Sequence, residues 1–240
     1  MAGLLSLERR DEVAVVTLQR PEKRNALSID LRIELTESFG ALSEDDDIGS
    51  VVLTGAGPAF CSGMDMTQFG GDRAHKEKLV ETSLASFRAV GNCSKPVVAA
   101  VNGPALAGGF ALALLCDLRI ASETASFGFP ELPQGIPPSY AAARAALPLP
   151  VAAELTLTGR LLDAFGAMRV GIVEAVHPAD ELMARALDLA GRIASGPRSA
   201  IAETKRRILL DREKTIGHLF EEEERALRAA LLGEPPDDAA

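Results

Sequence analysis

Two glycine-centred turns, each placed directly after a short apolar run, constrain the fold of this chain more than any other feature. The first turn spans residues 60–65 (FCSGMD) and follows the run at 50–53; the second spans residues 102–109 (NGPALAGG) and follows the run at 96–101. A strand that passes through such a turn into a helix leaves backbone N–H groups free at the turn. Two such turns, brought side by side, can stabilise a developing oxyanion. The order strand, turn, helix predicts an α/β fold with parallel strands.

The overall charge limits the partners of the protein. Its 240 residues carry 25 basic and 34 acidic side chains, and this net charge of −9 argues against nucleic acid and anionic membrane as main partners. No apolar run approaches the length of a membrane-spanning helix, and the first residues do not resemble a secretion signal. The three cysteines cannot all pair and show no metal-ligand spacing. We therefore expect a cytoplasmic protein without a metal site.

Hydrophobic periodicity divides the chain into an α/β part and a helical part. Ser28 is placed to cap the first helix of the α/β part. The predicted strands cover residues 13–18, 50–53, 96–101, 118–121 and 173–176, and further helices cover residues 76–91 and 106–115. We expect a core over residues 1–178 and a helical region over residues 179–240. On the last helix, Glu221–Arg225 and Glu224–Arg228 have the spacing of stabilising ion pairs.

Six segments, in this order along the chain, resemble those of the crotonase superfamily, the enoyl-CoA hydratase/isomerase proteins. They are residues 20–27, 59–65, 102–109, 116–121, 127–131 and 197–210. The resemblance extends over residues 4–232 and implies a crotonase-like (ββα)n spiral core with a C-terminal helical trimerisation region. It also implies a homotrimer or a dimer of trimers. Family members usually carry one more helix, which often completes the CoA pocket of a neighbour, so cross-subunit contacts to CoA are left open.

The resemblance further implies an acyl-CoA thioester substrate and the residues that bind it. The backbone N–H groups of Met64 and Gly108 would bind the thioester oxygen, and Glu131 would be the general base and acid. The residues implied to hold the CoA moiety are Arg24, Asn25, Ala26, Leu27, Ser62, Gly63, Met64, Asp65 and Gly108. The basic side chains Arg20, Lys23 and Arg24 would meet its phosphates. On this basis the reaction needs no cofactor beyond the CoA moiety of the substrate, and no metal.

One departure from the family pattern decides which reaction we expect. Family hydratases use two glutamates, and at the position of the first this chain has Ala111, which cannot transfer a proton. A lone Glu131 suits isomerisation of a 3-enoyl-CoA to a 2-enoyl-CoA, in which one group moves a proton from C2 to C4. Its apolar neighbours, at positions 127, 129, 132 and 136, are expected to raise the pKa of Glu131 toward the working pH.

The sequence leaves several alternatives open. Within the family, Glu131 alone could serve a hydratase or a hydratase-lyase. Ser139 or Tyr140 could contact the acyl group or assist proton transfer, although Tyr140 is also expected simply to pack against a helix. In another class, the chain could be an acyl-CoA-binding protein without catalysis. The sequence does not determine the acyl group or the pathway.

Three further patterns have little support. The glycines at 55 and 57 follow a strand, but position 60 is not a third glycine, so a dinucleotide-binding turn is disfavoured. Cys61 lies in the first turn without a positioned base, and we expect a small packing residue rather than a nucleophile. The three histidines do not form a triad-like pattern with a serine and an acid.

Overall fold

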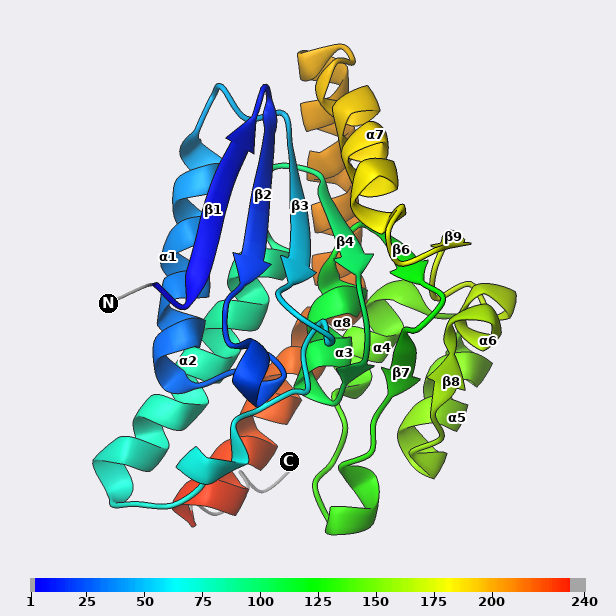
Figure 1. Ribbon diagram of the computed structural model, residues 1–240. Coiled ribbons are helices and arrows are strands. Elements are labelled where there is room, and N and C mark those ends of the chain that lie inside the picture. The colour runs from blue at the N-terminus through cyan, green and yellow to red at the C-terminus, as the bar shows by residue number, and fades with distance from the viewer. Residues whose placement is uncertain (1–2, 234–240) are drawn as a thin grey trace.

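The computed structural model describes residues 3–233, which form a six-stranded sheet with helices on both faces and a smaller sheet beside it (Figure 1). The large sheet has the order β1 (Leu5–Arg10), β2 (Val13–Leu18), β3 (Ser50–Gly55), β4 (Val97–Val101), β6 (Leu118–Ser122) and β9 (Ala175–His177). Only β1 and β2 pair antiparallel in it. The small sheet consists of β5 (Ala105–Leu106), β7 (Ser126–Gly128) and β8 (Leu162–Asp163).

The helices follow the strands in repeating units. They are α1 (Ile29–Glu44), α2 (Arg73–Gly91), α3 (Gly108–Leu115), α4 (Tyr140–Ala146), α5 (Leu149–Thr158), α6 (Ala164–Arg169), α7 (Leu182–Ala194) and α8 (Arg198–Leu232), with the 3-10 helices η1 (Pro21–Lys23), η2 (Met66–Gln68) and η3 (Leu132–Gln134). The runs β4–β5–α3 and β6–β7–α4 each repeat the order strand, strand, helix. The predicted α/β core and helical C-terminal part are thereby confirmed.

The parallel strands are buried on both faces, which explains their continuous apolar sequences. In β3, Val51 and Leu53 belong to the larger core cluster, which also contains residues of α1 and α3. Val52 points the other way and packs with Ala186 and Ala190 of α7. Because β3 and β4 are parallel, the segments that follow them leave the same edge of the sheet. Both glycine turns therefore lie at this edge.

Most predicted boundaries agree with the structure, and the starts of two helices differ. Ser28 caps α1 as predicted, since its Oγ accepts a hydrogen bond from Leu31 N at 3.3 Å. Helix α2 begins at Arg73 rather than at residue 76, because the carboxylate of Asp72 accepts from His75 N at 2.9 Å. The helix predicted from residue 106 begins only at Gly108, because residues 105–106 form the short strand β5.

The C-terminal part is formed by α7 and by one continuous helix, α8, of 35 residues. At 1.5 Å per residue α8 is about 50 Å long, and it packs against both α2 and α4 (Figure 1). The predicted pair Glu221–Arg225 is wrong, because Arg225 contacts Glu222 instead. Glu224 lies 3.6 Å from Arg88 of α2. No helix within residues 3–233 is long and apolar enough to cross a membrane. Residues 234–240 of the predicted helical region lie outside the described residues.

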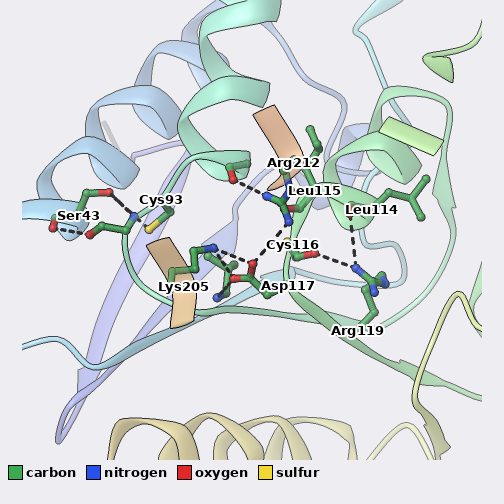
Figure 2. A network of polar contacts seen from close by, with 12 residues as sticks. Ser43, Cys93, Leu114, Leu115, Cys116, Asp117, Arg119, Lys205 and Arg212 are labelled. Atoms are coloured by element: carbon green, nitrogen blue, oxygen red, sulfur yellow. Dashed lines mark hydrogen bonds and ion pairs between the residues drawn. The ribbon is translucent and has the colours of Figure 1, made fainter. Parts of the chain in front are cut away.

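Buried charges tie α8 to the large sheet (Figure 2). Lys205 Nζ lies 2.7 and 2.6 Å from the two carboxylate oxygens of Asp117, next to the start of β6. The side chains of both residues are nearly inaccessible to solvent. Arg212 donates to the carbonyl oxygens of Gly91 and Leu115 and lies 3.5 Å from Asp117. The network joins α8 to the ends of α2 and α3 and to β6.

Candidate active site

The two glycine turns pack directly on each other. Cys61 pairs with Ala105 in a parallel bridge, in which Leu106 N donates to Cys61 O at 3.0 Å. A side chain at Gly109 would place its Cβ 2.1 Å from that same carbonyl oxygen, so only glycine fits there. A Cβ at Gly63 would lie 2.8 Å from Ala107 Cβ, and Gly63 also has a φ of 95°. The glycines are therefore required by backbone contact between the turns.

The backbone N–H groups of Met64 and Gly108 lie at this contact and have no acceptor among the described residues. In the bridge between Leu27 and Met64, Leu27 N donates to Gly63 O at 2.8 Å and Asp65 N to Leu27 O at 3.3 Å, which leaves Met64 N–H on the opposite side. Gly108 is the first residue of α3, where N–H groups lack a partner within the helix. Neither N–H donates to another group of residues 3–233. The helix dipole of α3 adds positive potential there.

Ala107 holds the second turn in an unusual backbone conformation. Its φ of 51° and ψ of −127° lie outside the regions that a residue with a Cβ normally adopts. Its N–H donates to Gly128 O at 2.9 Å, at the end of β7. This bond links the second turn to the segment that carries Glu131.

Glu131 lies just beyond β7, which pairs with β5 and so runs beside the second turn. Its Oε2 is buried and has no hydrogen-bond partner among the described residues. Burial raises the pKa of Glu131 to about 7, against a weaker opposing hydrogen bond from its own backbone. The predicted direction of the pKa shift is confirmed. A partly buried carboxyl group whose pKa lies near neutrality can both accept and donate a proton.

The four apolar residues expected around Glu131 differ in how deeply they are buried. Phe127 and Phe129 are fully buried, and both rings pack on Phe110 of α3, at centroid distances of 5.8 and 4.9 Å. Leu132 and Ile136 are only half-buried. The three rings and Ala111 of α3 belong to the same buried core cluster.

The segment implied to hold CoA is largely occupied by contacts within the protein. The Asn25 side chain is fully buried; it accepts from Arg20 N at 2.9 Å and donates to the carbonyl oxygens of Ala56 and Ala59 at 2.9 and 2.8 Å. The Ala26 carbonyl accepts from the Arg20 guanidinium. These groups fix the shape of the segment, and the Asn25 side chain is not free for a ligand.

Asp65 and Arg20 form an ion pair with a distance of 2.9 Å between Nη2 and Oδ2. Burial alone would raise the pKa of Asp65, but hydrogen bonds from Thr67 and Arg20 hold it below its ordinary value. The expectation that Arg20 meets the phosphates is therefore wrong, because its guanidinium is bound inside the protein. Lys23 and Arg24 are exposed.

The remaining residues implied for CoA connect these two segments. Leu27 is fully buried and bridges to Met64, as described above. Ser62 is half-exposed, and its N–H donates to Arg24 O at 3.0 Å. The structure thus brings the implied residues of 24–27 and 62–65 together in one place.

Helix α2 supplies two contacts that no sequence motif indicates. Ser83 Oγ lies 3.8 Å from the Met64 sulfur, and the tip of the Phe87 ring would lie 3.4 Å from a Cβ at Gly108. The only sequence signal for Phe87 was its place on the apolar face of the predicted helix. Helix α2 therefore forms a wall beside both candidate oxyanion donors.

Three other candidates have structural surroundings that limit their roles. Ser139 caps α4, accepting from Ala142 N at 3.1 Å, and donates to Glu223 of α8 at 2.8 Å, so its hydroxyl is not available to an acyl group. Tyr140 is half-buried and packs on the core, which agrees with the packing alternative. Burial raises the pKa of Cys61 to about 12, and the thiol stays protonated. Within residues 3–233 no cluster of histidine, cysteine and acidic side chains could hold a metal ion.

Comparison with known proteins shows the family of this chain. The model of the enoyl-CoA hydratase/isomerase family matches residues 8–234. The chain belongs to this family. It is 33% identical to a probable enoyl-CoA hydratase of Mycobacterium bovis over 231 residues, which are 95% of this chain and 90% of that protein. It is 36% identical to a short-chain-enoyl-CoA hydratase of Clostridium acetobutylicum over 207 residues, 84% of this chain and 79% of that protein.

One similar solved structure is named an isomerase, whereas the two relatives above are named hydratases. It is a monofunctional enoyl CoA isomerase from M. smegmatis, 33% identical, with a TM-score of 0.76; the match covers 92% of this chain and 99% of that one. The crotonase-type fold expected from the sequence is thereby confirmed. The protein is an enzyme of the enoyl-CoA hydratase/isomerase family, and an acyl-CoA thioester fits as its substrate.

Proposed function

We propose that this enzyme isomerises 3-enoyl-CoA thioesters to 2-enoyl-CoA thioesters with Glu131 as its single acid–base group. The observation that carries the proposal is the buried, unpartnered Oε2 atom of Glu131, whose carboxyl pKa is raised to about 7, on a segment that runs beside the second glycine turn. A hydratase of this family would carry a second glutamate where this chain has Ala111, buried in α3. A single group that takes and returns one proton is sufficient for isomerisation.

The reaction proceeds through a thioester dienolate. Glu131 takes a proton from C2 of the 3-enoyl thioester, and the negative charge moves to the thioester oxygen, where the N–H groups of Met64 and Gly108 bind it. The neutral Glu131 then returns the proton to C4, the double bond settles between C2 and C3, and the carboxylate is restored. Removing one such N–H donor typically costs about 3 kcal/mol of barrier, so the pair accounts for a large part of the acceleration.

The runner-up is a hydratase or hydratase-lyase in which Glu131 alone activates water. The names of the relatives favour it, since the Mycobacterium bovis and Clostridium acetobutylicum proteins are both called enoyl-CoA hydratases. The M. smegmatis isomerase, at similar identity, supports the proposed reaction. A binding protein without catalysis is the third alternative, and the unpartnered Oε2 atom of Glu131 speaks against it, because a buried polar atom without a partner costs stability unless it serves a function.

Product analysis separates these alternatives. Purified enzyme and its Glu131→Gln variant are each given a 3-enoyl-CoA and, separately, a 2-enoyl-CoA, and the products are followed by mass and absorbance. We expect conversion of the 3-enoyl to the 2-enoyl thioester without a gain in mass, and at least a thousandfold loss of rate in the variant. Addition of water to the 2-enoyl thioester, dependent on Glu131, would establish the hydratase instead. Binding of both thioesters without turnover would leave the binding protein.

We propose that the CoA moiety lies along residues 24–27 and 62–65, mostly against their backbone. The support is the clustering of these segments beside Met64, with Lys23 and Arg24 exposed next to them. Substitution of Lys23 and Arg24 by alanine should weaken CoA binding in calorimetry at low salt and reduce its salt dependence. Unchanged binding would place the phosphates elsewhere.

We further propose a homotrimer or dimer of trimers in the cytoplasm, with no cofactor beyond the substrate's CoA. Exposed apolar side chains on α5 and α6 support an assembly face, with Leu157, Phe165 and Met168 exposed by 76%, 49% and 41%. Three buried, unpaired cysteines are typical of a reducing compartment. The molar mass from light scattering should correspond to three or six protomers, and Leu157→Asp should reduce the number of protomers. A monomeric parent protein would refute the proposed assembly.

A further inference from the structure

Two peptide groups join the guanidinium of Arg20 to one of the proposed oxyanion donors. Arg20 Nη1 donates to the carbonyl oxygen of Ala26. The N–H of the same peptide group belongs to Leu27, and it donates to the carbonyl oxygen of Gly63 at 2.8 Å. The N–H of that second peptide group belongs to Met64. The hydrogen bonds therefore form a chain from the cation of Arg20 to an N–H that would bind the thioester oxygen.

The geometry of the peptide group gives this chain a direction. A trans peptide group is planar, so its C=O and its N–H point in opposite directions. The bond from Leu27 N to Gly63 O therefore fixes the direction of the Met64 N–H. The bond from Arg20 to Ala26 O fixes the direction of the Leu27 N–H in the same way. Each group in the chain has the positive end of its dipole toward the proposed position of the thioester oxygen.

The chain of hydrogen bonds runs through the interior of the protein. Leu27 is fully buried, and the side chains of Arg20 and Asp65 are 14% and 8% exposed. Charges act more strongly where water is excluded, and hydrogen bonds in series polarise one another. The carboxylate of Asp65 accepts from the other arm of the guanidinium at 2.9 Å, which holds the guanidinium against the Ala26 carbonyl.

The two proposed donors differ in what polarises them. Gly108 is the first residue of α3, and the Ala107 carbonyl of its peptide group accepts from Ala111 N at 3.0 Å within that helix. The helix dipole of α3 therefore acts on the Gly108 N–H. Met64 is followed only by η2, a 3-10 helix of three residues. The charge of Arg20 supplies at Met64 what α3 supplies at Gly108.

We propose that Arg20 is a positioning residue of this enzyme, which orients and polarises the Met64 N–H through the two intervening peptide groups. The inference rests on the proposed oxyanion site, and it adds a residue that acts on this site without touching the substrate. Loss of the guanidinium leaves the segment in place, because the Asn25 side chain holds it through its own bonds to two backbone carbonyl groups. The expected consequence is weaker binding of the developing oxyanion, with little change in the binding of the ground state.

The test measures the polarisation of the thioester carbonyl directly. Hexanoyl-CoA, a saturated thioester that cannot be isomerised, is isotopically labelled at its carbonyl carbon, and the infrared band of this carbonyl is recorded in water and bound to each protein. Polarisation of a carbonyl lowers the wavenumber of its band, so we expect a lower wavenumber on the parent enzyme than in water. Arg20→Met should lose about half of this shift, because the dipole of α3 still acts at Gly108.

Two further variants separate this role from support of the fold. Asp65→Asn keeps an oxygen beside the guanidinium and removes only the negative charge, so the full shift should remain. Lys205→Met removes the buried cation at Asp117, which precedes β6 at the other end of the parallel strands, and it should also leave the shift unchanged. A loss of shift in either variant equal to that in Arg20→Met would overturn the proposal.

Kinetics and binding distinguish an effect on the reaction from an effect on the pocket. In Arg20→Met, kcat for 3-hexenoyl-CoA should fall roughly tenfold, which is less than the roughly hundredfold loss that follows removal of a whole donor. The Kd of hexanoyl-CoA, measured by calorimetry, should change by less than about threefold, since the contacts of the ground state remain. A Kd that rises as much as kcat falls would contradict the proposed role.

The infrared measurement does not depend on turnover. If the bands behave as expected but no 3-enoyl thioester is converted, the proposed reaction fails and the role of Arg20 stands. If turnover occurs and Arg20→Met changes neither the band nor kcat, the role of Arg20 is overturned. If the parent itself shows no shift from the band in water, the proposed oxyanion site fails and the role of Arg20 fails with it.

Folding of each variant is checked by circular dichroism. Should Arg20→Met not fold, the double variant Arg20→Met, Asp65→Asn is used, in which no carboxylate is left without its cation. The same loss of shift is expected in the double variant, because the cation at the start of the chain is absent from both. An unchanged band in the double variant would equally contradict the proposal.

Discussion

At the scale of single residues, Glu131 shows how surroundings change the chemistry of an ordinary side chain. An exposed glutamate is ionised throughout the neutral range. Burial penalises the charged form and raises the pKa of Glu131 to about 7. The protonated and ionised states are then nearly equal in free energy at working pH. A group that must receive and return a proton benefits from this balance.

The raised pKa predicts an acid limb in the pH profile. The reaction begins with ionised Glu131, so kcat/KM should fall tenfold per pH unit below about pH 7 and level off above it. The measurement is kcat/KM for a 3-enoyl-CoA from pH 5 to pH 9 (roughly the stable range). A limb near the ordinary glutamate value of about 4.5 would contradict the burial argument.

A second buried charge, Arg32 of α1, offers a prediction about stability. Its side chain is fully buried and donates to Ser28 O at 3.2 Å and Leu79 O at 2.8 Å, while Nη2 has no partner among the described residues. Burial lowers the pKa of Arg32 to about 10, against an attraction from Asp65. The cost of this buried cation is therefore not fully offset.

Replacing it with an apolar side chain should stabilise the fold. Arg32→Met should raise the free energy of unfolding by about 1 kcal/mol, because the unpartnered donor disappears. Urea unfolding measures this, with Arg192→Met as the control at an exposed ion pair, where little change is expected. A clear loss of stability in Arg32→Met would mean that the guanidinium has a favourable partner in solution, such as bound water.

At the scale of elements, α8 fixes the start of α4 through one carboxylate. Glu223 accepts from Ser139 Oγ at 2.8 Å and from Ala141 N at 2.7 Å. A negative group at a helix N-terminus is favoured by the helix dipole and satisfies N–H groups that lack helical partners. Burial raises the pKa of Glu223, against the hydrogen bonds that it accepts. This contact also limits where the segment between Glu131 and α4 can lie.

Removal of the Glu223 carboxylate should destabilise the fold, whereas removal of the Glu222 carboxylate should not. Glu223→Ala should lower the free energy of unfolding by about 2 kcal/mol, because it leaves buried donors without an acceptor. Glu222→Ala is the matched control, since Glu222 is exposed and contacts only Arg225 in the described contacts; its effect should stay within about 0.5 kcal/mol. Equal effects of the two variants in denaturant titrations would argue against the capping role.

At the scale of the whole molecule, the Asp117 network attaches the C-terminal helix to the core. Lys205 is 2% exposed and contacts both oxygens of Asp117, while Arg212 reaches carbonyl groups at the ends of α2 and α3 (Figure 2). Breaking a buried ion pair leaves an uncompensated charge, which typically costs about 3–5 kcal/mol. Arg212 remains beside Asp117 at 3.5 Å and should soften this effect.

Removal of the lysine should therefore destabilise the protein as a unit. We expect Lys205→Met to lower the free energy of unfolding by about 3 kcal/mol, measured by urea titration at one protein concentration. Lys214→Met, at an exposed position of the same helix, should change it little. A small effect of Lys205→Met would show that Arg212 alone neutralises Asp117.

Parts of the site could be predicted from the sequence because their requirements are local. Gly109 and Gly63 are needed where the backbone turns tightly, and such positions show in the sequence as glycine. The absence of the first glutamate can be read directly from the sequence, because position 111 is alanine. The expectation that Arg20 meets the phosphates was wrong, because Arg20 and Asp65 lie 45 positions apart and their pairing depends on how the first turn folds back. Phe87 was not recognised as part of the site, since an apolar helix face does not indicate what it touches.

The sequence by itself determined the central strands and the main helices of the core, the two glycine turns and the single glutamate, because these are visible in periodicity and in local sequence. Only the tertiary structure decided the pKa of Glu131, the internal use of the Asn25 side chain, the wall formed by α2 and the attachment of α8 at Asp117. Burial and pairing are properties of segments distant along the chain. They arise only when the β5–β7 pairing and the packing of α8 bring those segments into contact.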